Sequence, residues 1–457
     1  MGQSDRDPRH ARAVVVGCVI LLLSLLAALP ARAVEVERVI SPGGIEAWLV
    51  QDHKNPIVAL NFSFEGGAAL DPEGKAGVAN LLSTLLDEGA GELDSQTFQR
   101  QLEDNAIRLG FGAGRDAFTG SLVTLSENQD EAYRLLRLAL SEPRFDDEAI
   151  ERMRNSVLAG IRRDLGNPDY IAQVTFSQTV FPDHPYGRPV RGSLETVPHI
   201  TRDDLRGFVK ERFAKDTLLV AAAGDITPDE LGLALDRVFG ALPSTATPFT
   251  IPEVVPKTEG QVLVASRPTA QSVLLLGQPG LKRKDPDWFP AAILNYVLGG
   301  GTFTSRLMEE VRVKRGLSYG VSSSLQPLDH SALLMAGGST VNVKAAETLA
   351  VIKDVWAGIA RDGITAEELA DAKTYLTGSF PLQFSSTASI SGVLLQVRRD
   401  DLGIDYLKRR SDLINAVTLD DVNRVARTLL DPVRLTTVVV GQPDGIQASK
   451  TPGEQGG

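Results

Sequence analysis

The chain contains an internal repeat, and this repeat limits the folds that it can adopt. Residues 201–225, TRDDLRGFVKERFAKDTLLVAAAGD, align without a gap with residues 418–442, TLDDVNRVARTLLDPVRLTTVVVGQ. Both segments read as a helix that begins after a threonine cap and leads into an apolar strand followed by glycine. Two generic helix-strand units can match by chance, but a gapless match of helix, turn and strand favours duplication. We therefore predict two similar α+β domains.

Length and composition fit this prediction. The chain has 457 residues, which is enough for two or three domains. Its contents of 43% hydrophobic and 23% charged residues are typical of a soluble globular protein. The formal net charge is -11 at pH 7. A nucleic-acid-binding protein needs a basic surface, so we expect no nucleic acid among the partners.

The first 33 residues have the pattern of a secretory signal. Arginines precede an apolar run from Ala13 to Leu29, and small residues follow at Ala31 and Ala33. This pattern predicts cleavage after Ala33, a periplasmic protein and no membrane association after cleavage. An uncleaved membrane anchor is the alternative. The only cysteine, Cys18, lies inside this segment, so the mature chain would have neither a disulfide nor thiol chemistry.

A segment rich in proline and threonine divides the rest of the chain. Residues 242–260, LPSTATPFTIPEVVPKTEG, show little hydrophobic periodicity and interrupt the alternation of strands and helices. We place an interdomain linker at 246–260. The predicted N-terminal domain then covers 34–245 and the C-terminal domain 261–446. Residues 447–457 have no apolar pattern and are predicted to be a disordered tail.

Three segments, in order along the chain, resemble a known family. They are GIEAWLVQDHKNPIVALNFSFEGGAALDPEGKAGVANLL from Gly44, FPDHPYGRPVRGSLETVPHITRDDLRGFVKERF from Phe181 and YVLGGGTFTSRLMEEVRVKRGLSYGVSSSL from Tyr296. They resemble the pitrilysin/insulinase (inverzincin) metallopeptidases, in particular the bacterial branch similar to mitochondrial processing peptidase. The resemblance covers nearly all of residues 35–445. It implies two homologous α+β domains, each an antiparallel-rich sheet with helices packed on one face, that form half of a clamshell chamber.

The zinc motif of this family is altered here. Family members bind zinc through His-x-x-Glu-His and a distant glutamate, and the glutamate of the motif is the general base. In this chain the motif positions are Asn80, Ser83 and Thr84, within GVANLLSTLL, and the distant position is Gly160. All four positions have therefore lost the family's residues, and we expect no metal in this chain.

No other metal site is indicated by the sequence. No two histidines of the mature chain lie at a helical or hairpin spacing suited to one metal. These histidines are His53, His184, His199 and His330. His184, in FPDHPYG, is typical of a turn or packing residue. Asp87 and Glu88 lie one turn after the motif, but two carboxylates alone do not make this type of zinc site. An enzyme with a new site of its own has no residue cluster to support it.

The second domain keeps more of the family's pattern. Arg312 and Tyr319 match an arginine and a tyrosine that follow a glycine-rich loop in the family and reach toward the catalytic zinc. A guanidinium and a phenol are suitable donors for a substrate carbonyl or an oxyanion. The alternative is that Arg312 forms a surface ion pair and Tyr319 fills a strand face. The loop itself, with Gly299, Gly300 and Gly301, either contacts an extended peptide substrate or simply ends a helix.

The chain has lost the zinc residues but keeps the arginine and the tyrosine. This is the pattern of the zinc-free subunit in some members of the resembled family. Some peptidases of this branch are heterodimers in which one subunit lacks the zinc motif. The resemblance thus implies a non-catalytic subunit, inactive alone, that completes the site of a zinc-binding paralogue carrying His-x-x-Glu-His and helps to enclose an extended peptide. The alternative is a binding or scaffold protein with this fold and no proteolysis.

Overall fold

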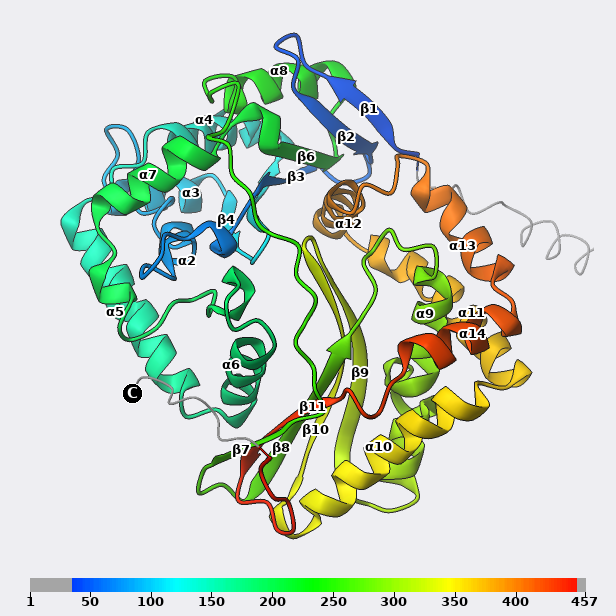
Figure 1. The fold of residues 1–457 in the computed structure, drawn as a ribbon. Helices are drawn as coiled ribbons and strands as arrows, with labels where there is room; N and C mark the ends of the chain where they lie inside the picture. Colours follow the sequence, from blue (N-terminus) through cyan, green and yellow to red (C-terminus); the bar gives the residue numbers. More distant parts are fainter. Residues whose placement is uncertain (1–34, 450–457) are drawn as a thin grey trace, which may run out of the picture. The chain divides into compact units, whose positions relative to one another are not determined.

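Two β-sheets form the framework of the chain (Figure 1). The computed structural model describes residues 35–449, so the predicted signal segment and residues 450–457 lie outside the described residues. The strands of the first sheet are β1 (Glu37–Ile40), β2 (Glu46–Gln51), β3 (Ile57–Glu65), β4 (Arg108–Ala113), β5 (Ala117–Leu125) and β6 (Leu218–Gly224). Those of the second are β7 (Val262–Ser266), β8 (Gln271–Pro279), β9 (Ser318–Leu328), β10 (Ser331–Val341) and β11 (Thr436–Gly441).

The two sheets have the same topology. Their strand orders are β1-β2-β6-β3-β5-β4 and β7-β11-β8-β10-β9. If β2 to β6 are matched in sequence with β7 to β11, the two orders coincide, and β1 is an addition to the first sheet. In each sheet only the first matched pair, β2 with β6 and β7 with β11, is parallel. The predicted α+β class with two similar, antiparallel-rich sheets is confirmed.

Helices follow the strands of both halves. In the first half they are α2 (Val78–Ser83), α3 (Ser95–Asp104), α4 (Gln129–Ser141), α5 (Asp147–Asp164), α6 (Pro168–Val180), α7 (Arg202–Arg212) and α8 (Pro228–Phe239). In the second half they are α9 (Trp288–Asn295), α10 (Ala345–Asp362), α11 (Ala366–Gly378), α12 (Thr387–Arg399), α13 (Tyr406–Ala416) and α14 (Leu419–Leu429). Two π-helices are η6 (Tyr296–Gly300) and η8 (Met308–Val313).

Short 3-10 turns complete the elements. They are η1 (Ala68–Leu70), η2 (Ser126–Asn128), η3 (Pro185–Gly187), η4 (Val197–His199), η5 (Lys215–Thr217), η7 (Thr302–Thr304), η9 (Asn342–Lys344) and η10 (Phe380–Phe384). Each sheet packs one face against helices of its own half to make a buried core, as Phe62 and Phe64 do with Leu82 in the first half. None of the helices within residues 35–449 is long and apolar enough to cross a lipid bilayer.

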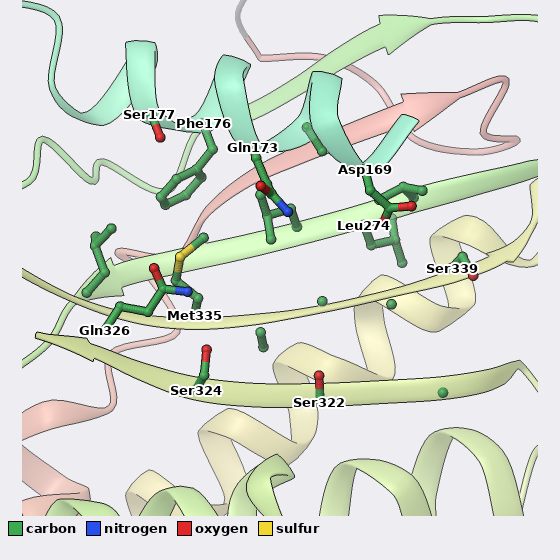
Figure 2. A pocket seen from close by; sticks show the side chains of 18 of the residues that line it. Asp169, Gln173, Phe176, Ser177, Leu274, Ser322, Ser324, Gln326, Met335 and Ser339 are labelled. Carbon is green, nitrogen blue, oxygen red and sulfur yellow. The ribbon is translucent and has the colours of Figure 1, made fainter. Parts of the chain in front are cut away.

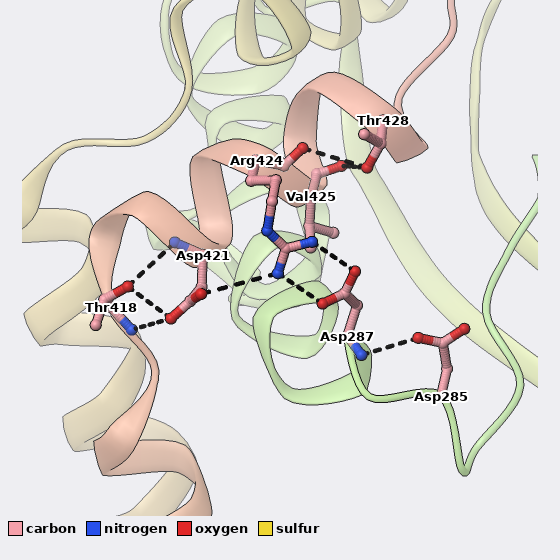
Figure 3. A network of polar contacts seen from close by, with 7 residues as sticks. All are labelled: Asp285, Asp287, Thr418, Asp421, Arg424, Val425 and Thr428. Atoms are coloured by element: carbon pink, nitrogen blue, oxygen red, sulfur yellow. Dashed lines mark hydrogen bonds and ion pairs between the residues drawn. The ribbon is translucent and has the colours of Figure 1, made fainter.

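The repeated segments begin with the same helix cap. α7 and α14 each start with a capping box, in which a threonine before the helix and the aspartate three residues later bond each other's backbone N–H groups. The pairs are Thr201 with Asp204 and Thr418 with Asp421. Figure 3 shows the second box, where Arg424 also forms a bidentate ion pair with Asp287 at 2.7 Å for both N–O contacts. This pair ties α14 to the start of α9.

The repeated strands also end in the same way. Gly224 ends β6 with a φ of 120°, and Gly441 ends β11 with a φ of 148°. A Cβ atom at Gly224 would lie 2.1 Å from the carbonyl oxygen of Ile57, and one at Gly441 would lie 2.6 Å from Oγ of Ser272. Both positions therefore need glycine, which explains its recurrence in the two copies of the repeat.

One helix of each half lies on the sheet of the other half. α6 packs on β8 and β11, and α12 packs on β3 and β6 (Figure 1). The α6 contact is apolar: Phe176 lies so close to Gly277 that an added Cβ would be 2.3 Å from the ring. The α12 contact is partly polar, because Asn61 Nδ2 of β3 donates to Ser391 Oγ at 2.6 Å. Each sheet thus carries a helix from the other half on the face opposite its own helices.

The predicted linker connects α8 with β7. Within residues 246–260 the structure has neither a helix nor a strand. The backbone N–H of Val254 donates to the carbonyl of His330, and that of Lys257 donates to the carbonyl of Val180, both at 2.9 Å. The segment is therefore bonded to both halves, and the predicted domain boundaries stay a prediction. At the other boundary, the ordered chain continues past 446, because Ser449 donates its N–H to the carbonyl of Val262.

Candidate functional site

Helix α2 carries Asn80 and Ser83 of the altered zinc motif and is followed directly by Thr84, and a buried carboxylate fixes where the helix begins. Oδ2 of Asp71 accepts the N–H of Gly77 at 2.7 Å, and Oδ1 accepts that of Ala79 at 2.9 Å. These are N–H groups that the first turn of a helix leaves without an internal partner. Burial raises the pKa of Asp71 to about 6, while the N–H donors favour its charged form.

The segment before α7 fits closely against the start of α2. Gly77 has a φ of 104°, and a Cβ there would lie 2.9 Å from the carbonyl oxygen of Arg191. Thr196 Oγ1 donates to the carbonyl of Ala76 at 2.7 Å. The position of α2 therefore depends on Asp71 and on these contacts, none of which involves a metal.

The altered motif positions form bonds within their own helix. Ser83 Oγ donates to the carbonyl of Asn80 at 2.8 Å, and Thr84 Oγ1 donates to the carbonyl of Leu81 at 2.8 Å. Ser83 is buried. A zinc site of this family needs two imidazoles and a carboxylate. Ser83 and Thr84 supply neither, and their hydroxyls are already bonded to the backbone.

An arginine occupies the space beside Gly160, the fourth altered position. A Cβ at Gly160 would lie 2.3 Å from Nη2 of Arg191. The Arg191 guanidinium forms an ion pair with Asp164, one turn later on α5. The guanidinium thus takes the space that a side chain at position 160, where the family would place a glutamate ligand, would need.

The remaining acidic groups near α2 are also engaged. Glu88 pairs with Arg152 and accepts a hydrogen bond from Ser95 Oγ at 2.5 Å. Burial, together with the neighbouring Glu88, raises the pKa of Asp87 to about 6. Within residues 35–449 no three His, Cys, Asp or Glu side chains come together to hold a metal. The residues present do not fit the zinc ion of the resembled family.

The predicted pair in the second half does come together. Arg312 lies on η8 and Tyr319 on β9, and Arg312 Nη1 donates to the carbonyl oxygen of Tyr319 at 2.8 Å. The same guanidinium lies over the ring of Phe303, 4.7 Å from its centroid. The Tyr319 side chain is 85% exposed. Arginine therefore fixes the tyrosine backbone and leaves its phenol in solvent. Within residues 35–449 no carboxylate lies within ion-pair distance of Arg312, so the alternative of a surface ion pair is not found.

The predicted glycine loop is a place of close packing. Gly299 and Gly300 belong to η6, and Gly301 ends it by donating its N–H to the carbonyl of Tyr296 at 2.8 Å. A Cβ at Gly299 would lie 2.5 Å from the backbone nitrogen of Ser323 on β9. The glycines thus allow η6 to lie against β9. Gly301 ends this helix, which is the second of the two roles that the sequence suggested for the loop. Contact with a peptide stays a prediction.

Tyr319 lines a cavity of about 680 Å³ between α6 and the second sheet. Figure 2 shows side chains of α6 facing side chains of the sheet across this space. From α6 come Asp169, Gln173 and Phe176, and from the sheet Ser322, Ser324, Gln326 and Met335. Asp169 and Arg115 are the only charged residues of the lining. A wall that has few charges and mixes hydroxyl, amide and apolar groups suits an extended peptide segment.

The sequence prediction missed this cavity. One signal was present, since Ser322, Ser324 and Gln326 alternate along β9 and so share a face. The contribution of α6 had no such signal, because it depends on a helix of one half packing on the sheet of the other.

Comparisons with known proteins agree with the geometry. Residues 47–193 match the family described as Insulinase (Peptidase family M16), and residues 199–376 match the Peptidase M16 inactive domain. A Helicobacter pylori protein named "Non-peptidase homolog YmxG" is 28% identical over 428 residues, which is 92% of this chain and 97% of that protein. The Bacillus subtilis "Uncharacterized zinc protease YmxG" is 27% identical over 362 residues, 77% of this chain and 85% of that protein.

Solved structures show the same fold. A crystal structure described as a peptidase M16 inactive domain from Pseudomonas fluorescens has a TM-score of 0.84 at 29% sequence identity. The match covers 92% of this chain and 100% of that one. A structure of a protease from Helicobacter pylori has a TM-score of 0.81 at 19% identity, which is a likeness of fold alone.

Proposed function

The chain belongs to the insulinase family of peptidases, family M16, and we propose that it is the non-catalytic subunit of a two-subunit zinc peptidase. The altered positions Asn80, Ser83, Thr84 and Gly160 support the absence of catalysis by this chain alone. So do the inactive-domain match and the name of the Helicobacter pylori relative. In this proposal the zinc and the general base lie in a paralogous partner that carries His-x-x-Glu-His.

The contribution of this chain to the shared site is the Arg312–Tyr319 pair. The observation that carries the proposal is the exposed Tyr319 side chain, anchored through its own carbonyl by Arg312. A phenol O–H held in this way is a positioned donor for the carbonyl oxygen of a scissile peptide bond and for the oxyanion formed from it. Arg312 has further N–H groups that can donate to the same oxygen or to a neighbouring carbonyl.

The substrate in this proposal is an extended peptide. It runs along the cavity between α6 and β9, with its backbone near Ser322 and Ser324. The chain then supplies half of the chamber, and the partner supplies the other half. We place the complex in the periplasm, on the basis of the N-terminal sequence pattern alone.

A second candidate is a binding or scaffold protein without proteolysis. The name of the Helicobacter pylori relative favours it, because that protein is called a non-peptidase homolog. In this case the cavity would still bind peptides, but Tyr319 and Arg312 would act in no reaction.

The test is reconstitution. The chain is prepared alone and together with a His-x-x-Glu-His paralogue of the same genome, and bound zinc and cleavage of an unstructured peptide are measured. We expect neither zinc nor cleavage with the chain alone, and both with the pair. Loss of one oxyanion donor typically lowers a rate by about 10²–10³-fold, so Tyr319→Phe should lower kcat of the pair at least tenfold while leaving zinc content unchanged.

Tyr375→Phe is the matched control, because Tyr375 is also exposed in the second half but does not line the cavity. Arg315→Ala is the control for Arg312→Ala, because Arg315 lies nearby and pairs with Glu310. A pair that forms and cleaves equally well with Tyr319→Phe and Arg312→Ala would show that this chain supplies no donor to the reaction. A pair that forms but does not cleave would support the scaffold function. Stoichiometric zinc in the chain alone would contradict both proposals.

A further inference from the structure

A separate cavity of about 550 Å³ lies within the second half, between α9, η10, α12 and α13. Helix α13 contacts α9, and η10 contacts α12; α9, α12 and α13 lie in one region of Figure 1. None of the residues that line this cavity belongs to the altered zinc positions, to the Arg312–Tyr319 pair or to the cavity under α6. Its volume lies within the range of sites for small ligands.

Aromatic side chains form much of its wall. Trp288, Phe289, Phe380 and Tyr406 all line the cavity. Leu376, Val393 and Leu402 add aliphatic surface. A ligand with an apolar body would therefore remove apolar surface from water on several sides, which favours binding.

Two arginines enter this aromatic wall. Arg283 donates through Nη2 to Oη of Tyr406 at 2.6 Å, and its guanidinium lies 4.7 Å from the centroid of the Trp288 ring. Arg410 lies 4.2 Å from the centroid of Phe380 and donates through Nη1 to the carbonyl of Leu376 at 2.8 Å. Both guanidinium groups line the cavity and stay charged at all ordinary pH values.

The charges of the lining do not balance. Asp400 is the only carboxylate among the lining residues, and its Oδ2 lies 3.5 Å from Nε of Arg283. Asp400 also accepts a hydrogen bond from Gln396 at 2.8 Å. Within residues 35–449 no carboxylate lies within ion-pair distance of Arg410. Burial lowers the pKa of Arg410, the Tyr406 side chain opposes this shift, and the nearby Arg283 adds to it.

We propose that this cavity binds a single carboxylate carried on an apolar body. The carboxylate lies at Arg410 and at the free N–H groups of Arg283, and the apolar body lies against Trp288 and Phe380. One surplus positive charge matches one negative charge, and the planar guanidinium fork matches a carboxylate. Two sources have this chemistry: the C-terminus of a peptide that ends in an apolar residue, and a free aromatic or aliphatic acid.

Intrinsic fluorescence of the full chain provides the test, because Trp288 lines the cavity. It is measured in a Trp48→Phe background, since Trp48 packs against the lining residues Val397 and Tyr406 and would add its own signal, whereas Trp356 is buried in another cluster. The probes are N-acetylphenylalanine, its C-terminal amide and a pentapeptide that ends in phenylalanine with a free carboxylate. We expect the acid to change the Trp288 signal saturably and the amide to bind at least tenfold more weakly. Binding of the pentapeptide alone would identify peptide C-termini as the source, and tight binding of the single amino acid would identify free acids.

Two pairs of variants make the test specific. Arg410→Gln should weaken binding at least tenfold, whereas Arg409→Gln should not, because Arg409 lies beside it on α13 and pairs with Asp405. Gly392→Leu should block the cavity without a backbone clash, since an added Cβ meets no atom within 4 Å. Gly358→Leu is its control, being equally open but outside the cavity. Equal binding of acid and amide, or undiminished binding by Gly392→Leu, would overturn the proposal.

Discussion

The two halves share one strand order but differ in what they keep of the site residues predicted from the sequence. In the first half, α2 keeps its place through Asp71 and Gly77, although its motif positions bond only to their own helix. In the second half, β9 carries Tyr319, and the side chain of this residue is exposed to solvent. The comparison teaches that packing and capping can preserve a helix after its chemistry has gone. A site and the scaffold beneath it are thus separable in this fold.

The largest expected effect on stability concerns the glycine that ends the repeated strand in both halves. Gly224→Ala should lower the free energy of unfolding by about 3–5 kcal/mol, because it combines an unfavourable φ with overlap on the Ile57 carbonyl. Gly441→Ala should cost less, about 2–3 kcal/mol, since its closest backbone contact is the Cα of Ser272 at 2.8 Å, whereas at Gly224 it is a carbonyl oxygen at 2.1 Å. Denaturant unfolding monitored by circular dichroism gives both values. Equal losses would show that the two strand ends are equally rigid.

Smaller losses of stability are expected where α6 packs on the second sheet and α12 packs on the first. The two contacts should differ in strength. Gly277→Ala should destabilise by about 1–3 kcal/mol, because its Cβ would displace the Phe176 ring of α6. Asn61→Ala removes the hydrogen bond to Ser391 of α12 and should cost about 1 kcal/mol. Adding Phe176→Leu to Gly277→Ala should recover part of the loss. If Asn61→Ala costs more than Gly277→Ala, the polar contact is the stronger of the two.

The pH dependence of stability should differ between the halves. Burial raises the pKa of Asp87 from its ordinary 3.8 to about 6. Between these pH values the folded state therefore binds more protons than the unfolded state. Stability therefore falls as pH rises from about 4 to 6, and Asp87→Asn should remove this fall and add about 1–2 kcal/mol at pH 7.5. Near pH 4 the substitution should have little effect. Urea unfolding at several pH values measures this.

Asp400→Asn is the comparison in the second half. Burial raises the pKa of Asp400 too, but Arg283 opposes the shift, so this variant should stabilise less at pH 7.5 than Asp87→Asn. A larger gain for Asp400→Asn would mean that Arg283 contributes little to the charge of this carboxylate.

The smallest effect on stability is expected at the exposed pair. Tyr319→Phe removes a hydroxyl from a side chain that is 85% exposed and should change the free energy of unfolding by less than about 0.5 kcal/mol. Thermal unfolding of this variant beside Tyr375→Phe checks the value. A clear loss for Tyr319→Phe alone would mean that Tyr319 supports β9 rather than acting on a ligand.

The sequence predicted what local patterns determine. The threonine caps, the apolar strands and the terminal glycines of the repeat recur in both halves because each is set by residues close together in the chain. The meeting of Arg312 and Tyr319 was also predictable, since a short turn separates them. Whether they act on a substrate stays a prediction.

Long-range contacts could not be predicted in this way. Arg191 covers Gly160 only because the segment before α7 folds back over α5. The cavity under α6 and the arginines near Trp288 likewise depend on helices that meet through tertiary packing. No residue pattern within either segment indicates its distant partner.

The placement of α12 on the first sheet has a consequence for the timing of synthesis. Ser391 follows Asn61 by 330 residues, and the helix that carries it must emerge before the first sheet is covered on both faces. At the usual rate of translation this takes roughly 15 to 65 s. During that time one face of the first sheet stays uncovered, because α12, which packs on it, has not yet been synthesised. A chaperone or an export factor that binds extended chains would have that interval in which to capture it.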